Sequence, residues 1–123
     1  MTRSSRHDQG QQAEQLACHY LQTQGLRLAQ RNYRCRLGEI DLVMEDGEHL
    51  VFVEVRCRRK GRFGSAIDSI TPTKQARLIA AAQHYLQQAG GTHNKPCRFD
   101  VVGITPLQGS NDIVWLQDAF RLE

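Results

Sequence analysis

The segment from Glu39 to Arg58 most constrains what this chain can fold into. Two β-rich stretches flank Asp46-Gly47, a dipeptide typical of tight turns between antiparallel strands. Apolar residues occupy both faces of the predicted hairpin. One face would carry Ile40, Leu42, Met44, Val51, Val53 and Val55, and the other Val43, Leu50 and Phe52. Because such a hairpin must be covered on both sides, the sequence predicts a layered α/β domain.

Helices and further strands are predicted on either side of this hairpin. Apolar residues at helical spacing predict a first helix over residues 9–24, which Gly25 ends. Thr71-Pro72 begins a second helix that runs to about Ala89, with a core stripe of Ala76, Ile79, Ala82, Leu86 and Ala89. Strands are predicted at 26–33, 97–104 and 113–116. A chain of 123 residues is of single-domain length, so we expect one domain over residues 1–123 with a central mixed sheet flanked by helices.

Carboxylates gather at one end of the predicted hairpin. With the turn centred on Asp46-Gly47, Asp41 lies opposite Phe52 and is a diagonal neighbour of Glu54. Glu39 projects from the same side, as does Arg56. Diagonal side chains about 7 Å apart at Cα can converge on one divalent cation such as Mg²⁺ or Mn²⁺. A strand carboxylate more often lies on a solvated face, but three together repel one another unless a cation or Arg56 compensates them.

The positive charge of the chain is unevenly distributed. The net charge of +3 permits a polyanionic partner without requiring one. Nine of the 16 Lys and Arg residues lie between Arg27 and Arg62, whereas four carboxylates and one arginine follow Phe99. A dense run of cations follows the predicted hairpin: Arg56, Arg58, Arg59, Lys60 and Arg62. This run suits a loop that tracks phosphates, although a solvated charge run is equally consistent with it.

Cysteine spacing and hydropathy set the expected environment. The four cysteines form no C-x-x-C pair and have no histidines at metal-ligand spacing, which argues against a zinc or redox site. The longest apolar run, Leu78 to Ala82, is too short to cross a bilayer. We therefore expect a cytoplasmic protein with free thiols and no membrane association.

Several ordered motifs make this chain resemble the YraN-like family of small proteins. They are Gly38 to Val43 (GEIDLV), Phe52 to Arg58 (FVEVRCR), the helix around Glu14, the Phe63-Gly64 loop and Arg98 to Val102 (RFDVV). That family is similar to the restriction-endonuclease-like, or PD-(D/E)xK, nucleases, and among them to archaeal Holliday junction resolvases. The resemblance implies a restriction-endonuclease-like three-layer fold and a magnesium-dependent endonuclease acting on DNA, including branched DNA.

The resemblance also assigns roles to individual residues. It implies that Asp41, Glu54 and the backbone carbonyl of Val55 bind the metal, with Glu14 as an outer acidic residue. Arg56 occupies the position where these nucleases carry lysine. Because arginine stays protonated, Arg56 could clamp a phosphate but could not act as a general base. An ammonium could instead come from Lys60, or from Lys74 in the first turn of the second helix.

Two other classes of function are consistent with the same residues. A catalytically lapsed accessory module would keep the nuclease fold and basic face and bind nucleic acid, or a nucleic-acid enzyme, without cutting. A purely structural interaction protein would pair the hairpin carboxylates with arginines such as Arg34 or Arg36. Keeping both Asp41 and Glu54 favours the enzyme, because carboxylates that hold no metal repel phosphate. A homodimer would suit a substrate with two equivalent strands.

Overall fold

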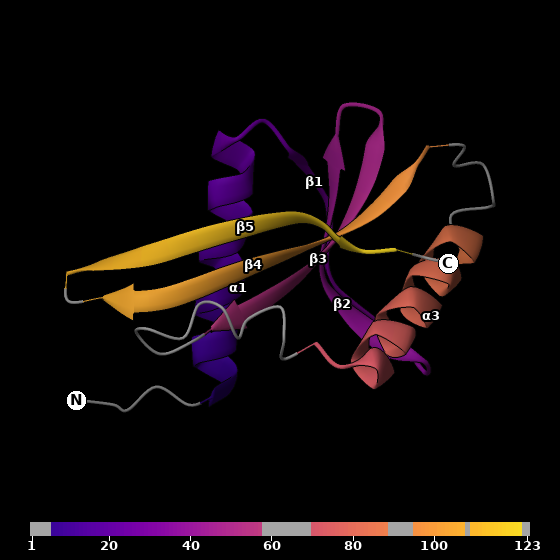
Figure 1. The fold of residues 1–123 in the computed structure, drawn as a ribbon, viewed down its shortest axis with the longest axis horizontal. Helices are drawn as coiled ribbons and strands as arrows, with labels where there is room; N and C mark the ends of the chain where they lie inside the picture. Colours follow the sequence, from indigo (N-terminus) through magenta and orange to yellow (C-terminus); the bar gives the residue numbers. More distant parts are fainter. Residues whose placement is uncertain (1–5, 58–69, 89–94, 108, 122–123) are drawn as a thin grey trace.

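The structure is a computed structural model that describes residues 6–57, 70–88, 95–107 and 109–121 (Figure 1). Its elements in chain order are α1 (Arg6–Thr23), β1 (Arg27–Cys35), β2 (Gly38–Asp46), β3 (His49–Cys57), α3 (Pro72–Gln88), β4 (Cys97–Leu107) and β5 (Ser110–Phe120). The strands form one five-stranded sheet in the order β1-β2-β3-β4-β5. Neighbouring strands are antiparallel except β3 and β4, which run parallel and are separated in sequence by α3. The expected mixed sheet with its hairpin and its 97–104 strand is thus confirmed.

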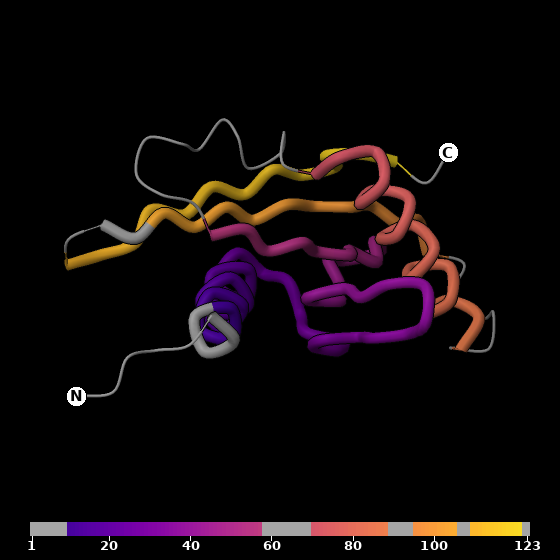
Figure 2. Tube along the Cα trace, turned by 90° about the horizontal axis from the view of Figure 1, so that it is seen from below, coloured from indigo at the N-terminus to yellow at the C-terminus, as the bar shows by residue number. Residues whose placement is uncertain are grey.

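The two helices cover opposite faces of the sheet and give a three-layer arrangement (Figures 1 and 2). α1 packs Ala17 and Leu21 against alternate strand residues such as Leu42, Val53 and Val102. α3 packs on the other face, against the intervening residues of the same strands. Its core includes Leu78, Ala81, Val43, Phe52, Phe99 and Val101. Both faces of the β2–β3 hairpin are therefore buried, as its apolar pattern predicted.

Local sequence signals explain most element ends. Gly25 follows the end of α1 at Thr23: it has a φ of 100° and donates its N–H to the carbonyl of Gln22, while Leu26 donates its N–H to the carbonyl of Leu21. This pattern of bonds is the Schellman motif that glycine favours. α3 begins where Thr71 Oγ1 accepts a hydrogen bond from the N–H of Lys74 at 3.2 Å. The predicted cap and first-turn proline are both used in this way.

The predicted hairpin register was wrong by two residues. Asp46 pairs with His49 and Val43 with Phe52, so the turn residues are Gly47 and Glu48 rather than Asp46 and Gly47. Gly47 takes a φ of 58° at the first position of this two-residue turn, a conformation that glycine adopts at little cost. The correction places Asp41 level with Glu54 instead of diagonal to it.

Three further expectations also need correction. Ile40 packs in the α3 core with Val43, not on the α1 face with Leu42, because the regular alternation of β2 breaks at Asp41. In the predicted α3 stripe, Ala76 is wrong because it is exposed, whereas Ala82 is buried and Ile79 and Leu86 pack against the core. The buried residues Leu78 and Ala81 were not predicted. β5 is also much longer than the predicted 113–116 segment, because it pairs with β4 over most of its length.

Gly38 brings the start of β2 close to α3. A Cβ atom at Gly38 would lie 2.8 Å from the backbone carbonyl oxygen of Arg77, which cannot swing aside as a flexible side chain could. We therefore expect Gly38→Ala to lower the free energy of unfolding by about 1–3 kcal/mol, the usual cost of overpacking.

Urea unfolding of Gly38→Ala and Gly10→Ala tests this contact. Gly10 lies in α1, and no atom of the described residues lies within 4 Å of a Cβ added there. Alanine at this position should leave stability unchanged or raise it by about 0.5–1 kcal/mol. Equal stability of the Gly38→Ala variant and the wild type would show that the close approach to α3 is not a constraint.

Candidate functional site

Asp41 and Glu54 come from the neighbouring strands β2 and β3, just beyond the last regular pair, Leu42 with Val53. There the Asp41 side chain takes the place of a backbone partner. Its Oδ2 accepts a hydrogen bond from the N–H of Val55 at 2.8 Å. This bond satisfies a backbone donor that the ladder leaves unpaired, and it holds the carboxylate beside Glu54.

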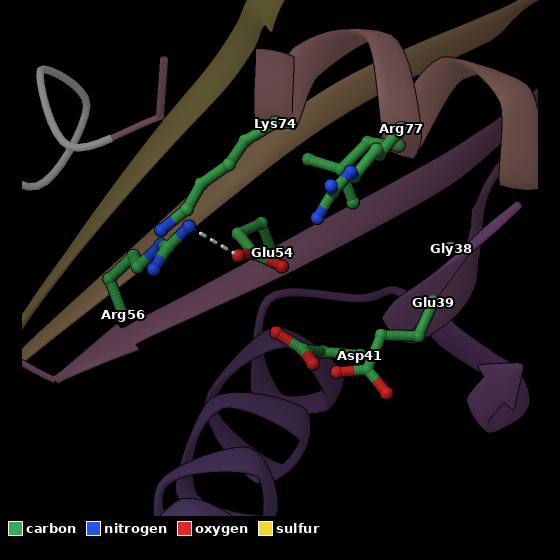
Figure 3. A pocket seen from close by; sticks show the side chains of 8 residues that line it. Gly38, Glu39, Asp41, Glu54, Arg56, Lys74 and Arg77 are labelled. Carbon is green, nitrogen blue, oxygen red and sulfur yellow. Dashed lines mark ion pairs between the residues drawn. The ribbon is translucent and has the colours of Figure 1, made fainter.

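Both carboxylates line a cavity of about 300 Å³ at the junction of β2, β3 and α3 (Figure 3). Lys74 and Arg77 extend into it from α3, and Arg56 closes one end from β3. The complete lining is Gly38, Glu39, Asp41, Glu54, Arg56, Lys74, Arg77 and Leu78. The cavity thus has an acidic floor from the strands and a basic wall from the helix.

Arg56 and Glu54 form an ion pair across part of this cavity. Arg56 Nη2 lies 2.8 Å from Glu54 Oε2, and the two side chains are only 17% and 16% exposed. The Nε of Arg56 is buried and has no hydrogen-bond partner among the described residues. This guanidinium therefore keeps an N–H donor that the described residues leave unpaired.

The surroundings of Glu54 disfavour its charged form. Burial, above all, together with the charge of Asp41 and a side-chain hydrogen bond with it, raises the pKa of Glu54 to about 8, while Arg56 and Lys74 act in the opposite direction. Two carboxyls that share a poorly solvated site cannot both ionise cheaply without a further cation.

Glu14 adds a third carboxyl from the face covered by α1. Its Oε1 atom is buried and finds no hydrogen-bond partner in the described part of the chain. Burial and the charge of Asp41 raise the pKa of Glu14, the Asn32 side chain lowers it through a hydrogen bond, and the charge of Glu39 raises it further. Glu14 is thus electrostatically coupled to Asp41, while its role as an outer acidic residue of a metal site stays a prediction.

The donor set fits a small divalent cation. Over residues 6–57, 70–88, 95–107 and 109–121, no group of three or more His, Cys, Asp or Glu side chains has the arrangement of a metal site. Mg²⁺, however, is commonly held by one or two carboxylates together with waters and substrate phosphates. Asp41 and Glu54 are two such carboxylates, and a cation between them would relieve the repulsion that, after burial, raises the pKa of Glu54.

The structure brings some predicted site residues together and leaves others outside its description. Lys74 lies in the cavity, as does Glu39, which is exposed and pairs with Arg34 at 3.3 Å. The predicted nucleic-acid contacts Arg58, Arg59, Lys60 and Arg62 lie outside the described residues. The carbonyl of Val55 stays a predicted metal ligand, and the N–H of the same residue donates a hydrogen bond to Asp41.

Sequence reasoning missed Arg77 and the role of Gly38. Arg77 lies three residues after Lys74 on α3, so the two cations occupy the same side of the helix. That spacing was a usable signal.

The fold and site define a three-layer α/β protein with a cavity in which acidic and basic side chains face one another. The chain belongs to the uncharacterised protein family UPF0102, whose model matches residues 13–104. It is 74% identical over 123 residues to a UPF0102 protein of Nitrosococcus oceani, and this match covers 100% of this chain and 99% of that protein. A UPF0102 protein of Stutzerimonas stutzeri is 50% identical, and the match covers 91% of this chain and 93% of that protein. One of Pseudomonas aeruginosa is 48% identical, and the match covers 96% of each chain.

Membrane insertion through a helix has no support in the described structure. Neither α1 nor α3 combines the length and apolar character that a bilayer span requires.

The raised pKa of Glu54 predicts how the stability of the metal-free protein depends on pH. Because this pKa of about 8 exceeds the unfolded value of 4.5, the folded protein holds the proton more tightly. The resulting stabilisation is complete below pH 4.5 and is lost as pH rises through about 8, by at most about 1.4 kcal/mol per pH unit. Glu54→Gln should therefore flatten the pH profile and be more stable than wild type above pH 8.

Thermal unfolding in chelator across this pH range measures the effect. Glu48→Gln, at an exposed position of the β2–β3 turn, is the matched control and should follow the wild-type profile. If the wild type loses no more thermal stability than Glu54→Gln between mildly acidic and alkaline pH, the pKa of Glu54 is not raised by folding.

Proposed function

We propose that this protein is a metal-dependent endonuclease that hydrolyses phosphodiester bonds in DNA. One observation carries the proposal: Asp41 and Glu54 converge on a cavity whose opposite wall is formed by cations from α3 and β3. A carboxylate pair alone would repel nucleic acid. Combined with a divalent cation and flanking arginine and lysine side chains, it suits the positioning of a phosphodiester for in-line attack. The three-layer fold and the resemblance to the restriction-endonuclease-like class support the same conclusion.

A bound Mg²⁺ or Mn²⁺ would polarise the phosphodiester and lower the pKa of a coordinated water. The residues themselves divide the remaining work. Asp41, oriented by the N–H of Val55, and Glu54 would hold the ion. Arg56 would exchange its pairing with Glu54 for a phosphate oxygen and stabilise developing negative charge there. Arg77 would hold the phosphate from the α3 side.

Lys74 is proposed to supply the ammonium that nucleases of this class carry at the position of Arg56. It lines the cavity from the first turn of α3, and its charge is felt at Glu54, where it lowers the pKa. Lysine carries a compact ammonium with three N–H donors, whereas arginine carries a planar guanidinium that stays protonated. We therefore propose Lys74, and not Arg56, as the group that would exchange a proton with the attacking water.

The competing proposal is an accessory module that binds nucleic acid without cleaving it. The short, largely buried ion pair between Arg56 and Glu54 favours this alternative, because it pairs the proposed clamp with a proposed ligand without metal or substrate. Cleavage and metal binding by defined variants separate the two proposals.

Asp41→Asn and Glu54→Gln should each abolish metal-dependent cleavage, by at least about 100-fold. Each change removes one charged ligand and leaves the packing of the hairpin largely intact. The measurement is cleavage of linear, flapped and four-way DNA with Mg²⁺ or Mn²⁺ against a chelator control, with Mn²⁺ affinity from calorimetry. Glu48→Gln should retain both activities. If the wild type cuts none of these substrates and Asp41→Asn binds Mn²⁺ as the wild type does, the accessory proposal replaces the nuclease.

Lys74→Met and Arg56→Lys test the source of the ammonium. Lys74→Met should reduce cleavage by about 10²–10⁴-fold, the usual contribution of a positioned acid or base, with little effect on Mn²⁺ affinity. Arg56→Lys in the Lys74→Met background should restore part of the activity, because it places an amine at the corresponding point of β3. Full activity of Lys74→Met would show that its ammonium takes no part in the reaction.

A further inference from the structure

A second hollow adjoins the carboxylate cavity at the turn between β1 and β2. It has a volume of about 410 Å³ and shares Gly38, Glu39 and Arg77 with the first cavity. Its remaining lining residues come from the end of β1 and the turn itself: Arg34, Cys35, Arg36 and Leu37. We refer to these seven residues as the basic cleft.

The basic cleft carries an excess of positive charge. Three arginines, Arg34, Arg36 and Arg77, face one carboxylate, Glu39. The Arg34–Glu39 pair is 3.3 Å long, with side chains 65% and 62% exposed, so water weakens it. Within the described ranges, Arg36 and Arg77 form no ion pair. Guanidinium groups in a concave surface are therefore available to an anion.

The backbone fixes the position of these cations relative to the carboxylates. Cys35 pairs with Gly38 across a tight turn, so Arg36 and Leu37 form its tip. The absence of a side chain at Gly38 lets this turn approach the backbone of α3 at Arg77. Arg77 in consequence borders both cavities, and Figure 3 shows it extending from α3 on the side where Gly38 and Glu39 lie.

We propose that the basic cleft binds the phosphodiester backbone of a nucleic-acid strand, next to the phosphate that would be bound in the cavity of Asp41 and Glu54. The proposal rests on the proposed function and adds a path for the strand, from the carboxylate cavity past Arg77 to the β1–β2 turn. Planar guanidinium forks match phosphate oxygens, and a row of them reads backbone rather than base sequence. The residues of this path differ from Arg58, Arg59, Lys60 and Arg62, on which the sequence prediction relied.

DNA binding by Arg34→Gln/Arg36→Gln tests the basic cleft. The probes are a fluorescein-labelled linear duplex and four-way junction, measured by polarisation with Ca²⁺ in place of Mg²⁺ and again in chelator. The variant should bind at least about tenfold more weakly, and its salt slope should fall by about 2, since each arginine removed leaves one phosphate without its neutralising cation. Arg34→Lys/Arg36→Lys, which keeps the charge, should recover most of the slope.

Arg27→Gln/Arg121→Gln is the matched control. Arg27 lies on the same strand as Arg34 and likewise pairs with a glutamate of β2, at 3.2 Å with 77% of its side chain exposed. Arg121 is similarly exposed and paired with Asp118. The control removes the same charge outside both cavities, and its affinity should change less than about twofold.

The outcomes separate this inference from the nuclease proposal. Three results would each overturn binding at the basic cleft. Both glutamine double variants could lose the same affinity, or the wild type could have no affinity for DNA. Inorganic phosphate could also compete as effectively as DNA at equal phosphate concentration. Normal binding by Arg34→Gln/Arg36→Gln, together with cleavage that depends on Asp41, would overturn the cleft and leave the nuclease standing. Weakened binding without any wild-type cleavage would support the cleft alone.

Discussion

The hydrogen bond from the N–H of Val55 to the Asp41 carboxylate is the interaction on which the rest of the site depends. It lies where the regular β2–β3 ladder stops, and it replaces a backbone pair with a side-chain acceptor. The same break in alternation moves Ile40 into the α3 core. A carboxylate that would otherwise be an ordinary strand residue is thereby fixed beside Glu54 and at the floor of a cavity.

The contact of α3 with the start of β2 places basic side chains opposite the carboxylates of the cavity. Gly38 allows the two backbones to meet at Arg77, and Lys74 then projects over the carboxylates from the preceding turn of the helix. Opposite charges are held within one small, partly desolvated volume, where their interactions are stronger than in water. The result is a buried carboxyl, Glu54, with a raised pKa, in a cavity that three cationic side chains also line.

Much of the architecture followed from residue periodicity, whereas the register did not. The hairpin, both helices and β4 were predicted, because apolar residues at strand and helix spacing must be buried against one another. The turn was misplaced because glycine at the first position of a two-residue turn and glycine at the second satisfy the same local signal. Asp41 and Glu54 were nevertheless expected on one side of the hairpin and both line one cavity, since a shift of two residues in the register leaves their faces unchanged. Arg77 was missed because its approach to the start of β2 depends on the contact of α3 with Gly38, which residue periodicity does not show.

The sequence by itself determined that this chain forms a mixed sheet covered on both sides, and that carboxylates gather at one end of a hairpin. These properties depend on local periodicity and charge, which a sequence states directly. Only the tertiary structure decided which cations face those carboxylates and that a second basic hollow adjoins them. Arg34, Arg36, Lys74 and Arg77 are far from Glu54 in sequence, and their convergence depends on the packing of α3 against β2 through Gly38, a contact between distant segments that no local pattern encodes.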